Sequence, residues 1–313
     1  MVSIERAQIE SAWRDVLLSP PSPEQADAIE RRLSGAIGTL TDRLRLYYHL
    51  ATSVKLEISR LIPHLVVIVE AAPFLDASNS LGLVTPGTPE HRLVAEAWRK
   101  ALSEWPEDPS ALVNASDFFL DNDFEQASRL VQGAVRYAPN DPTVLLRAAA
   151  LELYGLDLGR PECAARAALK FAERALENPA APRYGYALAA TAAYESSQDA
   201  QAQIHALEAS RTDCFNPFDN IHRGMTVLGG LALSSGNVAR ATELLDRSAR
   251  GRLGYRGPSL RLARQLVVAG AERPVLAYLG AVKDQWDGPR EKCDEWMDAV
   301  KTHDLGRLRN PGQ

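Results

Sequence analysis

The sequence predicts an all-α protein built from consecutive helix pairs, and three observations support this fold class. Apolar residues recur at spacings of three and four along most of the chain, which is the periodicity of an amphipathic helix. Alternating runs of Val, Ile and Thr bounded by tight-turn dipeptides, the usual strand signals, are nearly absent. Prolines and small residues also return after 33 or 34 positions, which indicates a repeated helical unit.

The beginning of the chain is predicted to form a separate helical segment of three or four helices. In residues 9–17 the apolar side chains share one helical face. The PPSP sequence at 20–23 then interrupts the chain, and Ser22 is placed to cap a second helix that starts with Pro23. The charged, amphipathic N-terminus does not resemble a signal peptide.

The N-terminal segment is expected to end at a long loop. A third helical stretch is predicted over about residues 41–61, and Pro63 and Pro73 are expected to interrupt the chain after it. Residues 74–90 are rich in Ser, Gly and Pro, which favours a loop. The predicted domains are therefore an N-terminal helical segment, residues 1–80, and a helical repeat domain, residues 90–313.

The internal repeat appears in two separate pairs of segments. Pro106 and Pro139 are 33 residues apart (139 − 106) and stand in the similar sequences WPEDPSAL and APNDPTVL. A later pair of segments aligns with an offset of 34, which places Gly236 opposite Gly270. Two independent pairs with nearly the same period indicate stacked helical units.

The repeat resembles the tetratricopeptide repeat, a helix–turn–helix unit of 34 residues. Its motif has small residues at positions 8, 20 and 27 and proline at position 32. With Asp108 as position 1, these positions are occupied by Ala115, Ala127, Ala134 and Pro139. The resemblance implies a right-handed α-solenoid in which small residues let the two helices of a pair approach closely.

The resemblance covers about two thirds of the chain and implies about five helix pairs. The match is strong at 108–141, good at 222–255 and weaker at 256–285, where Val275 replaces a small residue. An insertion is expected around residues 155–163. Parts of the later repeats are also similar to uncharacterised bacterial repeat proteins, a similarity that implies no chemistry.

Composition excludes several classes of partner. The net charge of −5 predicts no general attraction to nucleic acid or to anionic membranes. The longest apolar run, residues 65–72, is far shorter than the ~20 residues that span a bilayer, and is expected to be a buried helix segment. Cys163, Cys214 and Cys293 are scattered and odd in number, which favours a reducing compartment. A soluble cytoplasmic protein is expected.

No catalytic motif is found in the sequence. Gly-rich phosphate loops, paired metal-ligand spacings and the Gly-x-Ser-x-Gly sequence are missing, so no catalytic residue, metal or cofactor is expected. Several polar and aromatic residues are instead assigned structural roles: His64 in packing, Asp117, Asp121 and Asp123 at a solvated turn, and Trp286 and Trp296 as a cap on the last helices.

Surface recognition remains, because stacked helix pairs bind partners on an inner, concave face. In this family that face is lined by positions 2, 5, 9 and 12 of the first helix of each pair. Counting these positions gives a basic, aromatic lining in an acidic protein, which suits an acidic peptide or a carboxylate. The candidate ligand-binding residues are Phe119, Arg183, Tyr186, Tyr194, His222, Arg223 and Arg264, with Arg261 as an alternative to Arg264.

Two features of these candidates are open to other interpretations. The arginines are equally well explained as solvated or salt-bridged residues, and His222 as a packing residue at a helix start. Leu112 and Leu146 stand where chaperone-binding members of the family need polar residues, so their two-carboxylate clamp is not reproduced.

The geometry of the candidate face can be predicted in part. Arg183 and Arg223 lie at the start of successive first helices, so their guanidinium groups are expected to converge. Tyr186 and Tyr194, eight residues apart, are expected to share a helix face beside them.

The most favoured function is a protein- or peptide-binding adaptor or scaffold. The alternative is an enzyme with a pocket enclosed between the N-terminal helices and the concave face, acting on a small molecule or peptide. A closed pocket with convergent polar groups would favour the enzyme, whereas an open groove rimmed by Arg and Tyr would favour the adaptor. A homodimer formed through the N-terminal helices is a third possibility.

Overall fold

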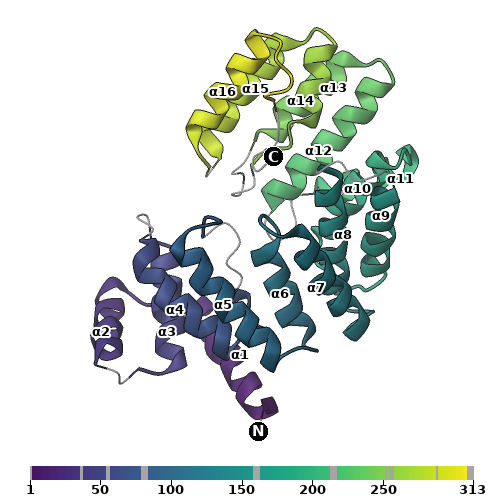
Figure 1. The fold of residues 1–313 in the computed structure, drawn as a ribbon. Coiled ribbons are helices and arrows are strands. Elements are labelled where there is room, and N and C mark those ends of the chain that lie inside the picture. Colours follow the sequence, from purple (N-terminus) through teal and green to yellow (C-terminus); the bar gives the residue numbers. More distant parts are fainter. Residues whose placement is uncertain are drawn as a thin grey trace. The chain divides into compact units, whose positions relative to one another are not determined.

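The computed structural model is helical throughout the part of the chain that it describes (Figure 1). Those residues contain 16 α-helices, one short 3-10 helix and a single isolated β-bridge, which confirms the predicted all-α class. The chain divides into two compact units, Met1–Pro139 and Asn140–Gln313. The described residues are 2–35, 38–53, 57–78, 84–157, 163–211, 217–250, 253, 257–286 and 288–308.

The N-terminal unit begins with four helices, in agreement with the three or four that were predicted. Ser22 caps the second helix as expected: its Oγ accepts a hydrogen bond from the Gln25 backbone N–H at 3.3 Å. The Gln25 side chain in turn accepts from the Ser22 backbone N–H at 2.9 Å, which completes a capping box. These helices are α1 (Val2–Leu18), α2 (Pro23–Ser34), α3 (Leu40–Ala51) and α4 (Ile58–Ala71).

The predicted helix over residues 41–61 is wrong, because two helices occupy this region. α3 ends at Ala51, and α4 continues through Pro63 rather than stopping before it. A proline inside a helix costs ~3 kcal/mol. The apolar run that follows offsets this cost, because each fully buried aliphatic side chain contributes ~1.5–3 kcal/mol. Leu65, Ile68 and Val69 are all fully buried, as the apolar run predicted.

The last three helices of this unit include the strongest repeat match. Ala115, Ala127 and Ala134, the predicted small residues, are completely buried where α6 and α7 pack together. Asp108 caps α6 by accepting a hydrogen bond from the Ala111 backbone N–H at 2.9 Å. These helices are α5 (Pro89–Glu104), α6 (Pro109–Phe119) and α7 (Phe124–Tyr137).

A buried asparagine fixes the start of the predicted 74–90 loop. Asn114 on α6 donates from Nδ2 to the carbonyl oxygens of Pro73 at 2.9 Å and Leu75 at 3.0 Å. These bonds hold the chain on either side of Phe74, just before the short helix η1 (Asp76–Ser78). Residues 79–83 of the predicted loop lie outside the described residues.

The three aspartates expected at a solvated turn have different environments. Asp121 and Asp123 are exposed, and Asp123 caps α7 by accepting from the Gln126 backbone N–H at 2.9 Å. Asp117 is only 1% exposed, so its predicted solvation is wrong. It lies on α6 before the turn, on a stretch of that helix that is buried throughout.

In the C-terminal unit four helix pairs stack in series as an α-solenoid, and a last helix follows them. The first helices of the pairs, α8, α10, α12 and α14, contact one another in that order. Together with α6 and α7, the described residues therefore contain five helix pairs, in agreement with the prediction of about five. The helices are α8 (Pro142–Asp157), α9 (Cys163–Leu176), α10 (Gly185–Glu195), α11 (Asp199–Ala209), α12 (Pro217–Ser234), α13 (Val238–Ser248), α14 (Arg261–Val268), α15 (Glu272–Gln285) and α16 (Arg290–Lys301). Most of the predicted insertion at 155–163 lies outside the described residues.

The turns inside three of these pairs have the same geometry. Gly236 and Gly270, which the 34-residue offset aligned, both have left-handed backbones, with φ of 82° and 79°. Ser197 occupies the same place in the α10–α11 turn with φ of 58°. In each turn the next backbone N–H reaches back five residues to a carbonyl, the bond of a Schellman motif, as from Asn237 to Ala232 at 2.8 Å.

The end of the C-terminal unit is closed by aromatic packing, in agreement with the predicted cap. Trp286 and Trp296 are buried and stack with ring centroids 5.4 Å apart. Cys293 is buried nearby, and burial raises the pKa of its thiol to about 11. Cys293 and the exposed Cys163 are free thiols, whereas Cys214 lies outside the described residues.

Candidate functional site

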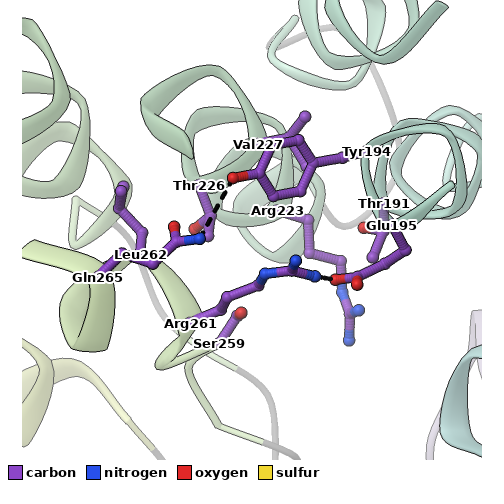
Figure 2. A pocket seen from close by; sticks show the side chains of 10 residues that line it. All are labelled: Thr191, Tyr194, Glu195, Arg223, Thr226, Val227, Ser259, Arg261, Leu262 and Gln265. Atoms are coloured by element: carbon purple, nitrogen blue, oxygen red, sulfur yellow. Dashed lines mark hydrogen bonds and ion pairs between the residues drawn. The ribbon is translucent and has the colours of Figure 1, made fainter. Parts of the chain in front are cut away.

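A small hollow opens in the C-terminal unit beside the first helices of three successive pairs (Figure 2). It encloses about 50 Å³. One water takes ~30 Å³ of liquid volume and small-molecule pockets take ~300–1,000 Å³, so the hollow admits one functional group and not a whole substrate. Its lining residues are Thr191, Tyr194 and Glu195 of α10, Arg223, Thr226 and Val227 of α12, and Ser259, Arg261, Leu262 and Gln265 at α14.

Two adjacent glycines of α12 position two of the lining side chains. A Cβ atom on Gly230 would lie 2.5 Å from the Tyr194 hydroxyl oxygen, and one on Gly229 would lie 2.3 Å from Leu262 Cδ2. At both distances a Cβ atom would force the neighbouring side chain to move. The glycines therefore let Tyr194 from α10 and Leu262 from α14 pack directly on the α12 backbone.

The Tyr194 ring is held from two directions by α14. Gln265 donates from Nε2 to the Tyr194 hydroxyl at 3.3 Å, as Figure 2 shows. The guanidinium carbon of Arg261 lies 4.8 Å from the centre of the ring, within range of a cation–π contact. An aromatic ring with a fixed position and a polar tip therefore forms one wall of the hollow.

An ion pair joins α10 to α14 across the mouth of the hollow. The guanidinium of Arg261 pairs with the carboxylate of Glu195, the last residue of α10 (Figure 2). The two side chains are 42% and 24% exposed. Partly solvated pairs of this kind contribute no more than ~1 kcal/mol to stability, so this pair is easily exchanged.

A second guanidinium comes from α12. Arg223 is partly buried and lines the same hollow as Arg261. Thr226 lies one helical turn further on, where its hydroxyl donates to the backbone carbonyl of His222 at 2.8 Å. The hollow thus combines two arginines, one tyrosine and one glutamate from three different helix pairs.

Arg183 and Tyr186 lie elsewhere on the α10–α11 hairpin. The Arg183 guanidinium lies 3.4 Å from the Glu208 carboxylate and 5.8 Å from the centre of the Tyr186 ring. Tyr186 is also 6.2 Å from the His205 ring of α11. Eight residues along a helix correspond to a rotation of ~80°, which explains why Tyr186 and Tyr194 contact different helices. The structure does not bring Arg183 and Tyr186 to the hollow.

His222 is buried inside the α12–α13 hairpin, with 1% exposure. Its Nδ1 lies 3.2 Å from the Ser248 carbonyl oxygen, and its Nε2 accepts a hydrogen bond from the Ser259 backbone N–H at 2.8 Å. These contacts require a proton on Nδ1 and a lone pair on Nε2, which is the neutral imidazole. His222 therefore joins the end of α13 to the segment before α14.

The remaining two candidates are not among the residues that line the hollow. Phe119 is buried in the N-terminal unit, where its ring meets Phe118 edge to face with centroids 5.0 Å apart. Arg264 is exposed on α14, and Arg261, the alternative candidate, lines the hollow in its place. Of the seven predicted residues, the hollow contains Tyr194 and Arg223.

Glu195, Gln265 and the glycine pair were not among the sequence candidates. One signal for Glu195 was available, because an acidic residue at the end of a helix is opposed by the helix dipole and needs another reason to be there. Adjacent glycines within an amphipathic helix similarly signal close contacts on neighbouring faces. The sequence contains no comparable signal for Gln265.

A second hollow, of about 140 Å³, lies in the N-terminal unit and is mostly polar. Its single arginine, Arg60, pairs with Glu30 at 2.7 Å and with Glu57 at 3.2 Å, so its charges partly compensate one another. Within the described ranges, no group of three or more His, Cys, Asp and Glu side chains is arranged to hold a metal ion.

Comparison with protein-family models and with curated proteins finds no match to this chain. No helix in the described part of the chain combines the length and the apolar character needed to cross a bilayer.

Proposed function

We propose that the protein is a tetratricopeptide-like adaptor of the bacterial cytoplasm that binds a peptide segment of a partner protein across α10, α12 and α14. An Asp or Glu side chain of the partner would enter the hollow. The observation that carries this proposal is the presence of Tyr194, Arg223 and Arg261 around one opening, each from a different helix pair.

The chemistry of the hollow supports a carboxylate as its occupant. Guanidinium groups match the planar carboxylate in charge and in hydrogen-bond geometry, and an aromatic wall provides contact area for the aliphatic stem. The volume of about 50 Å³ accommodates such a group while the rest of the segment lies on the surface. The partner segment would therefore be anchored at one position, by a single acidic side chain.

The proposed family and location have separate support. The 34-residue offset that aligned Gly236 with Gly270 corresponds to matching turns in the structure. The free thiols of Cys163 and Cys293 are compatible with a reducing compartment.

Selection of random peptides displayed inside a phage coat protein tests the proposal. Such peptides have no free C-terminus, so only side-chain carboxylates can be selected. We expect enrichment of Asp and Glu on the wild-type protein. Each charge-assisted hydrogen bond contributes ~1.5–3 kcal/mol, so Arg223→Ala with Arg261→Ala should weaken the selected peptides by a factor on the order of a hundred or more.

Arg183→Ala provides the matched control. This arginine also lies near a tyrosine and a glutamate but is away from the hollow. Its removal should leave peptide affinity unchanged. Enrichment of neutral or basic peptides, or equal binding by the double variant, would show that the hollow is not an acidic-peptide site.

A further inference from the structure

The carboxylate of Glu195 already pairs with one of the two guanidinium groups that the proposed function assigns to a partner. It is bound to Arg261, and Tyr194, its neighbour in the sequence, contacts the same guanidinium through its ring. We infer that Glu195 is a built-in competitor, whose carboxylate holds Arg261 until a carboxylate of the partner displaces it. This inference rests on the proposed function and adds a form of regulation to it.

The position of Glu195 on α10 supports this role. It is the last residue of the helix, where the helix dipole disfavours a negative charge. The cation that compensates it, Arg261, comes from α14, 66 residues later (261 − 195). A residue that is unfavourable in its own helix and is paired at the hollow is typical of a functional position.

The exposure of the pair makes displacement possible. Both side chains are in contact with solvent, so Glu195 can move into water when a partner takes its place. A partly solvated pair of this type has a small coupling energy, which limits the competition to a factor of ~2–5 in affinity. Salt should reduce this factor, because screening weakens exposed ion pairs.

Titration of the protein with N-acetyl-glutamate methylamide tests the inference, and N-acetyl-glutamine methylamide serves as the neutral probe. Binding is followed through the NMR signals of the Tyr194 ring and the Arg261 side chain. We expect Glu195→Gln to bind the glutamate probe ~2- to 5-fold more tightly than the wild type at low salt. Glu208→Gln, which removes the partner of Arg183, should bind like the wild type.

The outcomes separate the two proposals. If the wild type binds the glutamate probe and Glu195→Gln binds it equally or less tightly, Glu195 is not a competitor, although the carboxylate site stands. The carboxylate site itself is wrong if neither protein binds the glutamate probe up to its solubility limit. It is also wrong if both proteins bind the glutamine probe as tightly as the glutamate probe. Thermal unfolding of each variant confirms that the protein remains folded.

Discussion

The C-terminal unit contains two groups of Arg, Tyr and Glu that have similar chemistry and different positions. In one group Arg183, Tyr186 and Glu208 all belong to the α10–α11 hairpin or the turn before it. In the other, Tyr194 and Glu195 end α10 while Arg261 comes from α14. The second group lines the hollow described above, and the first group does not.

The difference teaches that composition does not distinguish a binding position from an ordinary surface contact in a repeat protein. The local group joins residues of one hairpin and can form wherever that hairpin folds. The group between pairs exists only if α10, α12 and α14 are stacked with the correct spacing. The second group is a site because the helix pairs stack closely, and the two adjacent glycines of α12 permit that close stacking.

The largest expected effect concerns Gly230, which lies against Tyr194 of the second group. In Gly230→Ala the new methyl group would lie 2.5 Å from the Tyr194 hydroxyl, so the ring must move and lose its contacts with Gln265 and Arg261. Overpacking of this kind costs about 1–3 kcal/mol. Urea denaturation measures the loss, and the local group around Tyr186 should be unaffected.

Gly280→Ala is the matched control for that change. Gly280 lies inside α15, and apart from its chain neighbours and its own helix backbone no atom lies within 4 Å of where its Cβ would be. Alanine there should stabilise the protein by up to ~1 kcal/mol through helix propensity. Equal effects of the two substitutions would mean that Tyr194 does not rest on Gly230.

The next effect compares the two arginines directly. Arg261→Ala removes an ion pair and a cation–π contact at 4.8 Å, and should lower the free energy of unfolding by about 1–1.5 kcal/mol. Arg183→Ala removes a longer pair and a ring contact at 5.8 Å, and should cost about 0.5 kcal/mol. A larger loss of unfolding free energy from Arg183→Ala than from Arg261→Ala would contradict this prediction.

A smaller, stabilising effect is expected at the turn that joins α10 to α11. Ser197 has a left-handed backbone with φ of 58°, where glycine stands in the equivalent turns at 236 and 270. Ser197→Gly should raise the free energy of unfolding by about 0.5–1 kcal/mol, because glycine adopts this conformation without strain. Thermal unfolding would show a higher midpoint, and a lower one would contradict the shared geometry of the turns.

The last effect is a pH dependence of stability that comes from two histidines of the N-terminal unit. It must be subtracted before the stabilities of the C-terminal variants are compared at different pH values. Burial and the nearby Arg43 lower the pKa of His64, and burial lowers the pKa of His91. The unfolded chain, with a His pKa of ~6.5, therefore binds more protons than the folded chain. Stability should be full above that value and fall as the pH drops below it.

Hydrogen exchange followed by mass spectrometry at pH 7 and at lower pH shows where stability is lost. We expect faster exchange at the lower pH in α3–α6. The double variant His64→Asn with His91→Gln keeps acceptor atoms facing Arg43 and Asn122 without the titrating rings. Its stability should depend less on pH than that of the wild type. An unchanged pH dependence would assign the effect to other groups.

The sequence predicted most of the fold because its signals are local. The small residues at 115, 127 and 134 and the turn glycines at 236 and 270 each report on one helix pair. The site was predicted only in part, because it depends on contacts between pairs. Tyr194 and Arg223 were found by counting positions, whereas Gln265 and the pairing of Glu195 with Arg261 required knowledge of how α14 lies against α10.

The failure at Pro63 has a different physical origin. Proline is a strong local signal against helix, and how much burial opposes that signal cannot be read from the sequence. The structure shows a buried apolar face on both sides of this residue, including Leu61 and Leu65. Tertiary packing therefore outweighed a local preference there.

The three glycines of α12 also affect how the C-terminal unit folds. Gly224 faces Ser210 at the end of α11, Gly229 faces Leu262 of α14, and Gly230 faces Tyr194 of α10. Three helical glycines cost roughly 3 kcal/mol in total, so α12 is a poor helix by itself and gains its stability from neighbours on three sides. In a stacked repeat, stability is a sum of unit and nearest-neighbour terms. A weak unit between strong interfaces couples those neighbours, so this part of the chain should unfold in one cooperative step.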